Sequence, residues 1–325
     1  MVFPSNTVET SLNVDVERNQ ILALATAIQG NTSLKHLEIH FTDEIDDQGA
    51  TAFAEALRIN STLNVMILTD NLIGDDILVR IADSLTVNNS LTHLHLGSNS
   101  IGDQGAMALA EALKSNTRLS TLDLSVNSIE DSGVMALADA LRINTSLANL
   151  DLGINLIGTE GVHAIAEALK VNASLTKLDI PVNYMGADGA TALAEAMKVM
   201  NTTLTSLDIG DNSIGDEGAT SLADALKVNI TLTQLDLSLN SIGMIGITAL
   251  ADALRYNPSL TRLDISCNAI ECDDEATSLQ AIQAYKLDTT RNLQMLIHKI
   301  VGGHASNVLS NVYRMKFSAL STLEI

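Results

Sequence analysis

Six aspartates recur at intervals of 28 or 29 residues, and they are the residues whose type and spacing come nearest to a chemical motif: Asp123, Asp151, Asp179, Asp208, Asp236 and Asp264. Neighbouring carboxylates act as acid–base pairs or bind cations where a pocket encloses them. If the interval reflects a structural repeat, the six carboxylates stand about 4.8 Å apart on adjacent strands. A row on an open sheet offers no such pocket, so we predict that these aspartates are not catalytic.

Four histidines and a glutamate near the N-terminus raise the question of a metal site: His36, Glu38, His40, His93 and His95. His93 and His95 alternate along one expected strand and stand about 6.5 Å apart on the same face, but His36 and His40 lie two strands away. A tetrahedral zinc site needs ligands that converge on one point. We therefore predict no metal.

The cysteines and short motifs indicate no enzyme. Cys267 and Cys272 have no partner ligands nearby and cannot supply a disulfide framework, which favours a reducing, cytoplasmic compartment. Phosphate loops, Gly-x-Ser-x-Gly and His-Glu-x-x-His are all missing from the sequence. We predict a protein without catalytic activity or cofactor.

The spacing of the aspartates comes from a unit that occurs nine times, with opening leucines at Leu34, Leu63, Leu91, Leu119, Leu147, Leu175, Leu204, Leu232 and Leu260. In the fourth unit, residues 119–129 alternate apolar and polar side chains, which predicts a short strand. In the third, residues 105–114 place Ala106, Leu109, Ala110 and Leu113 on one helical face. Each unit therefore predicts one strand and one helix.

A single strand–helix unit cannot enclose a core, so the units must stack and share one. Strands pack about 4.8 Å apart and helices about 8–10 Å apart, so we expect strands on a concave face and helices on a convex face. Two further columns support this solenoid. Asn99 and its equivalents are expected to bond the turn after each strand, and Asn116 and its equivalents to end each helix in the left-handed conformation.

Charge limits the partners. The 325 residues carry a formal charge of −21, which disfavours nucleic acid and anionic membrane surfaces. No stretch approaches the about 20 apolar residues that span a bilayer, and the first 20 residues lack a secretory signal. We expect a monomer that binds a protein partner, for which a basic surface is one option.

The pattern Leu-x-x-Leu-x-Leu-x-x-Asn-x-Ile-Gly, followed by Gly-Ala-x-Ala-Leu-Ala-Glu-Ala-Leu, resembles leucine-rich repeats of the ribonuclease-inhibitor-like class over residues 31–272. The resemblance implies an α/β horseshoe and a non-enzymatic interaction scaffold. The class also includes Ran GTPase-activating proteins, innate immune receptors and bacterial effectors. Regulation of a small GTPase, and binding of a host protein in the host cytosol, are therefore the alternatives. The chain departs from ribonuclease inhibitors because it has two cysteines and no tryptophan.

The sequence predicts three regions: an N-terminal cap with a partial repeat helix (1–33), nine repeats (34–276) and a basic helical cap and tail (277–325). The central outward column of the concave face begins with Glu38, Ile67 and His95 and continues with the six aspartates. Val65 and Ile67, beside His93, form an apolar pair that we predict to be the main contact. Coverage of this pair by the first 15 residues is the alternative. For the aspartates, the alternative to a binding role is that Leu-Asp-Leu is a common strand pattern in such repeats.

Overall fold

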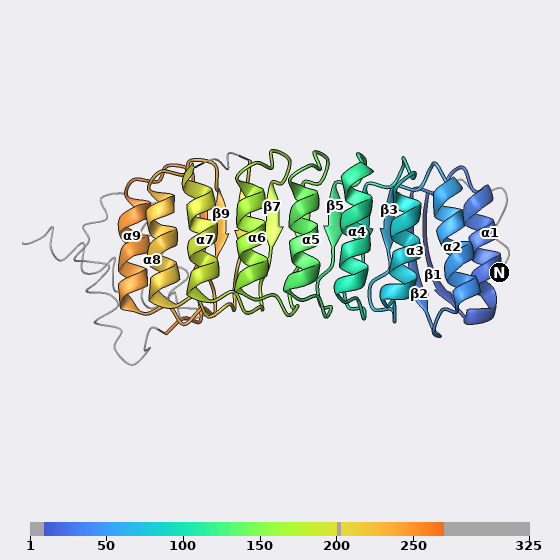
Figure 1. The fold of residues 1–325 in the computed structure, drawn as a ribbon, viewed down its shortest axis with the longest axis horizontal. Helices are drawn as coiled ribbons and strands as arrows, with labels where there is room; N and C mark the ends of the chain where they lie inside the picture. The colour runs from blue at the N-terminus through green and yellow to red at the C-terminus, as the bar shows by residue number, and fades with distance from the viewer. Residues whose placement is uncertain (1–9, 200–202, 270–325) are drawn as a thin grey trace, which may run out of the picture.

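The computed structural model describes residues 10–199 and 203–269. In this part of the chain, ten strands form one parallel sheet in strict chain order, and a helix follows each of the first nine strands. Figure 1 shows the helices side by side in one layer with the strands in a second layer behind them. The predicted α/β solenoid is confirmed.

The strands are short, and from β3 onward each begins 28 or 29 residues after the one before: β1 (Ser11–Val16), β2 (His36–Phe41), β3 (Val65–Ile67), β4 (His93–His95), β5 (Thr121–Asp123), β6 (Asn149–Asp151), β7 (Lys177–Asp179), β8 (Ser206–Asp208), β9 (Gln234–Asp236) and β10 (Arg262–Asp264). The helices connect successive strands: α1 (Ile21–Gly30), α2 (Asp47–Ile59), α3 (Asp75–Leu85), α4 (Asp103–Ser115), α5 (Asp131–Leu141), α6 (Thr159–Leu169), α7 (Gly186–Val199), α8 (Gly215–Leu226) and α9 (Met244–Leu254). A 3-10 turn, η1 (Arg18–Gln20), precedes α1.

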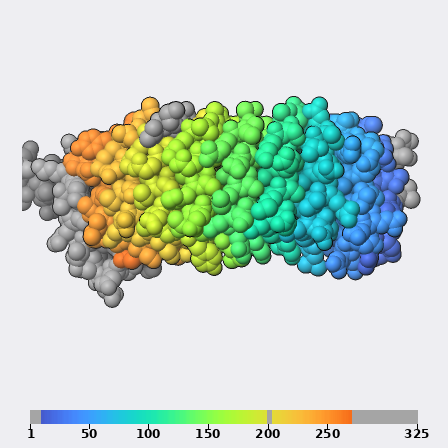
Figure 2. Space-filling view, viewed as in Figure 1, coloured from blue at the N-terminus to red at the C-terminus, as the bar shows by residue number. Residues whose placement is uncertain are grey.

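One hydrophobic core runs through all described repeats, from Val14 to Ile265. Helix α4 shows how a repeat contributes to it, since the predicted stripe Ala106, Leu109 and Leu113 is fully buried. Alanines on the inner faces let the helices pack closely, and each buried leucine contributes about 1.5–3 kcal/mol. The space-filling view shows successive repeats in contact without a break (Figure 2). Stacking, rather than any single repeat, therefore holds the fold together.

The first asparagine column performs its predicted role. The Nδ2 of Asn99 donates to the carbonyls of Leu68 and Leu96 at 2.9 Å, and its Oδ1 accepts from the Ile73 amide at 3.1 Å. Each such side chain bonds its own turn and the preceding repeat. These bonds satisfy main-chain groups that the strands leave free.

The prediction for the second asparagine column is wrong. Asn60 and Asn116 end their helices with φ of −65° and −73° and extended ψ, not in the left-handed conformation. From this position the buried Asn60 donates to the Ile28 carbonyl at 2.7 Å and accepts from the Leu63 amide at 2.8 Å. These side-chain bonds hold the backbone of the asparagine in the extended conformation. Positive φ occurs instead in the turns that follow β3 to β10, for example 55° at Ser98.

Strand β1 is the main feature that the repeat pattern does not predict. Residues 11–16 pair in parallel with β2, from Ser11 against His36 to Val16 against Phe41. The segment extends the sheet at its edge, and β2 separates it from β3. Residues 11–16 therefore do not fold over Val65 and Ile67, which overturns this part of the coverage alternative.

Two other expectations concern the C-terminal region and a membrane-spanning helix. The predicted C-terminal cap and tail and Cys272 lie outside the described residues. Among the helices that the structure describes, none is long and apolar enough to cross a bilayer.

Candidate functional site

The six aspartates occupy one row of the concave face. In the sheet register, Asp123 pairs with Asp151, Asp151 with Asp179, and the row continues strand by strand to Asp264. Glu38, Ile67 and His95 extend it toward β2. Asn13 of β1, which the sequence pattern does not place there, adds one more position beside Glu38. We call the six carboxylates the aspartate column.

Main-chain amides anchor these carboxylates. The Oδ1 of Asp151 accepts from the Gly153 amide at 2.9 Å, and the Oδ1 of Asp208 accepts from the Gly210 amide at 3.0 Å. Such a bond to the amide two residues later forms a side-chain-closed turn as the chain leaves the strand. Asp151 and Asp208 therefore have a structural role in these turns, and that role uses one oxygen of each carboxylate.

In the middle of the column, Lys177 compensates the carboxylate charges only in part. Burial raises the pKa of Asp151 to about 6, against the bond from Gly153, and the charges of Asp123 and Asp179 raise it further. Burial likewise raises the pKa of Asp208, helped by Asp236 and Asp179. Neutral carboxyl groups are favoured where like charges stand together in a half-buried row. A cationic group brought to this row would stabilise the ionised form.

Two residues of the chain already relieve part of the column. Lys177 pairs with Asp179 at 2.5 Å, and this carboxylate raises the pKa of the lysine. Burial favours the neutral form of Asp123, but bonds from His95 at 3.4 Å and from Ser125 outweigh it and lower the pKa of Asp123. The column thus remains least compensated at Asp151 and Asp208.

A shallow cavity of about 190 Å³ opens beside the second of these residues. Lys177 and Arg262 line it together with Asp208 and Asp236. The cavity offers hydrogen-bond acceptors flanked by donors, which suits a polar side chain of a partner better than a buried small molecule.

The predicted apolar pair lies where the sequence places it, at the other end of the concave face. Val65 and Ile67 are half-buried on β3, between His36 and Glu38 on one side and His93 and His95 on the other. Their partial burial makes the pair a smaller patch than the sequence suggests.

The histidines near this pair make local contacts. The Nε2 of His40 lies 3.4 Å from the Glu38 carboxylate, and the Nδ1 of His93 lies 2.8 Å from the Thr92 hydroxyl. Burial lowers the pKa of His93, and the charge of His95 lowers it further. Within residues 10–199 and 203–269, no group of three or more His, Cys, Asp or Glu residues is arranged to hold a metal ion.

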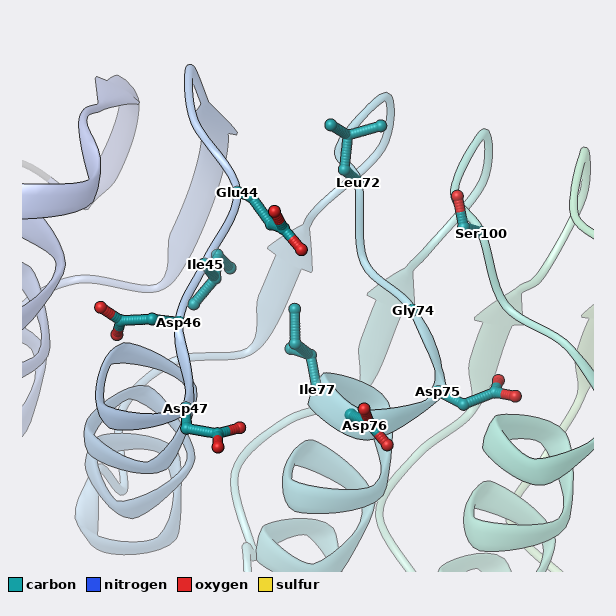
Figure 3. A pocket seen from close by; sticks show the side chains of 10 residues that line it. All are labelled: Glu44, Ile45, Asp46, Asp47, Leu72, Gly74, Asp75, Asp76, Ile77 and Ser100. Atoms are coloured by element: carbon teal, nitrogen blue, oxygen red, sulfur yellow. The ribbon is translucent and has the colours of Figure 1, made fainter.

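An acidic pocket of about 590 Å³ lies at the edge of the sheet, between the starts of α2 and α3 (Figure 3). Two of its carboxylates cap helices. Asp46 caps α2 through the Gly49 amide at 2.8 Å, and Asp75 accepts from the Gly102 and Gly105 amides of the next repeat at 2.8 and 3.0 Å. Helix capping, within a repeat for Asp46 and between repeats for Asp75, accounts for these two carboxylates.

The comparisons with known proteins agree with this geometry. The family profile described as leucine-rich repeat matches residues 30–54, 87–110, 115–138, 201–223, 228–251 and 256–271. A structure of the Rad7–Elc1 complex in yeast is similar with a TM-score of 0.52 and 17% identity, covering 81% of this chain and 65% of that chain. The chain contains leucine-rich repeats.

Two further solved structures have lower TM-scores. An internalin from Listeria monocytogenes has a TM-score of 0.47 and 20% identity over 75% of this chain and 65% of its own. The actin-binding site 2 region of leiomodin-1 has a TM-score of 0.41 and 23% identity over 47% of this chain and 88% of its own. No curated protein sequence is significantly similar to the chain. The ribonuclease-inhibitor-like subclass stays a prediction.

The leucine-rich repeats carry one surface that the sequence pattern does not single out. Beyond the aspartate column, the fourth to sixth repeats present five exposed apolar side chains in the turns after the strands: Val126, Ile154, Leu156, Val182 and Tyr184. Their exposed fractions run from 39% to 68%. We call these five residues the rim ridge.

Three members of the rim ridge have a strained backbone. Val126, Ile154 and Val182 each have φ of 55°, and branched side chains are rare in this left-handed region, where they cost about 1–3 kcal/mol. In the second, third and seventh repeats this position is polar, for example Ser98, a residue type that fits the conformation better. The eighth repeat has Leu239 there, two strands away from the ridge. The sequence contains a signal for this surface, because three consecutive repeats have a branched apolar residue at the same turn position.

Proposed function

We propose that this leucine-rich repeat protein is a non-enzymatic scaffold whose concave face binds a protein partner with a basic surface. The observation that carries the proposal is the row of like charges, in which each carboxylate stands beside the next from Asp123 to Asp264 and the pKa of Asp151 and of Asp208 is raised. Lysine or arginine side chains between these carboxylates would replace repulsion with attraction. In the free protein Lys177 relieves only part of this electrostatic cost, so a basic partner gains the remainder on binding.

Attraction between close opposite charges is strong enough to matter here. At about 4 Å and an effective dielectric of about 20, a charge pair is worth about 4 kcal/mol before desolvation costs. The carboxylates are half-buried on one sheet face, so their potentials add over several strands. We expect Val65 and Ile67, with Glu38, His93 and His95, to extend the contact toward β2. Their apolar surface would add affinity that does not depend on salt.

The proposal is tested with a dye-labelled octalysine peptide as the probe. A column variant carries Asp151→Asn, Asp208→Asn and Asp236→Asn, and each asparagine keeps an oxygen that can accept the main-chain bond. We expect the variant to bind the peptide about tenfold more weakly at low salt, with a smaller loss of affinity as salt is added.

A matched control removes the same charge from the helical side. Glu55→Gln, Glu160→Gln and Glu217→Gln change three exposed carboxylates on α2, α6 and α8. If net charge alone attracts the peptide, both variants lose affinity equally, and the proposal fails. The alternatives implied by the resemblance, GTPase regulation and a delivered effector, stay predictions. A stimulated rate of GTP hydrolysis would distinguish the first from passive binding.

A further inference from the structure

The rim ridge combines two features that stability alone does not explain. Its side chains are large, apolar and exposed, and three of them adopt a backbone conformation that suits serine, asparagine or aspartate. The conformation is imposed by the repeat, because the amides of Val126 and Ile154 donate to the carbonyls of Gly153 and Pro181 at 2.8 Å. Residues that cost stability and expose apolar surface are expected where they serve binding.

The ridge lies beside the first three carboxylates of the aspartate column. Val126, Ile154 and Val182 each follow a column aspartate by three residues in the same tight turn. Between the two rows, the residue before each of these three is small or compact: Ser125, Gly153 and Pro181. No long side chain at these positions therefore separates the carboxylates from the apolar ridge, and one ligand can contact both.

We propose that the rim ridge and the aspartate column form one composite docking surface for a protein segment that alternates basic and large apolar side chains. The inference rests on the proposed function, because the column must receive the basic side chains. Charge complementarity selects the segment: the row of carboxylates requires Lys or Arg, and the adjoining ridge requires apolar partners. An extended chain running across the repeats presents successive side chains on opposite sides, so alternate residues meet the two rows.

Two synthetic octapeptides test the inference on the full chain. One alternates lysine and leucine, the other alternates lysine and serine, and affinity is measured by fluorescence anisotropy. We expect the wild-type protein to bind the lysine–leucine peptide at least about tenfold more tightly. A ridge variant with Val126→Ser, Ile154→Ser and Val182→Ser is expected to lose this preference and to keep its affinity for the lysine–serine peptide.

The control makes the same chemical change elsewhere. Ile143→Ser and Val171→Ser replace side chains that are each 60% exposed beyond the C-terminal ends of α5 and α6. We expect these changes to leave the preference for the lysine–leucine peptide intact. The ridge variant should melt at the same temperature as the wild type or higher, because serine suits positive φ better than a branched residue does. Loss of binding in a protein that is not destabilised would separate docking from folding.

The outcomes distinguish the two proposals. Equal wild-type affinity for the two peptides, or a ridge variant that keeps the preference, overturns the composite surface and leaves the column proposal standing. If the column variant still binds the lysine–serine peptide normally, the proposed function fails. A wild-type dimer that the ridge variant converts to a monomer would assign the ridge to self-association and overturn the inference.

Discussion

Replacing Asp151 with asparagine tests the electrostatic interpretation of the concave face. The substituted side chain keeps an oxygen to accept the Gly153 amide, which bonds the Asp151 Oδ1 at 2.9 Å, but it cannot ionise. The difference between a pKa of about 6 and the ordinary value of 3.8 corresponds to about 3 kcal/mol. Because the carboxylate is only half-buried, solvent screening reduces the expected gain to about 1–2 kcal/mol at neutral pH.

The gain should depend on pH in one direction. Burial and like charges raise the folded-state pKa of Asp151 above its unfolded value, so the folded state binds more protons between these two values. The stability of the wild type therefore falls as the pH rises from about 4 to about 7, and the variant lacks this contribution. The two proteins should be equally stable at low pH and diverge toward neutrality.

Urea unfolding at several pH values measures the effect, with Glu217→Gln as the control. Glu217 is an exposed carboxylate on α8, so its loss changes the net charge equally without touching the column. We expect the control to show no gain in stability toward neutral pH, because Glu217 lies in the first turn of α8, where a negative charge favours the helix. The electrostatic explanation is wrong if the variant at Asp151 is destabilised at neutral pH, or if its advantage does not change with pH. The carboxylate would then be a structural acceptor that asparagine cannot replace.

Three further predictions concern the fold and the apolar pair. Asn212→Ala should lower the free energy of unfolding by about 2–4 kcal/mol. The change removes a fully buried amide that donates to the carbonyls of Ile180 and Gly210 at 2.8 and 3.0 Å, and calorimetry would measure the loss of stability. Asp75→Ala should cost about 1–2 kcal/mol in urea unfolding, since the amides of the α4 start lose their acceptor in the preceding repeat; an unchanged midpoint would contradict this. Ile67→Asp should fold with little loss of stability, because Ile67 is only half-buried, and it should weaken partner binding; a protein that unfolds would show that the pair is structural.

The strand and the helix of each repeat can be predicted from the sequence, because each depends on the spacing of apolar residues over a short segment. Leu94 and Leu122 alternate with outward residues and lie buried in β4 and β5, and the α4 stripe is buried as predicted. Stacking then places every equivalent residue in one row, so the aspartate column could be drawn from the spacing alone. Its electrostatics could not, because the pKa of Asp151 depends on burial and on the distances to neighbours.

The features that the sequence did not predict have physical causes. Asparagine tolerates positive φ in an isolated helix end, but Asn60 is buried, and its bonds to the previous repeat require the extended conformation. Strand β1 lacks the leucine pattern of the repeats, although Leu12, Val14 and Val16 alternate as a strand should. The branched apolar residues of the rim ridge can be read from the sequence, but the exposure and the backbone strain at Ile154 are properties of the folded turn.

Chemical coupling can identify the carboxylates that touch a basic ligand on the concave face. Zero-length carbodiimide coupling of the lysine–serine peptide to the full chain joins a lysine amine only to a carboxylate in contact with it, and mass spectrometry then locates the adducts. We predict adducts on Asp151, Asp208 and Asp236 that added salt suppresses. Adducts confined to helical carboxylates such as Glu55 and Glu217 would show that the aspartate column does not bind the basic ligand.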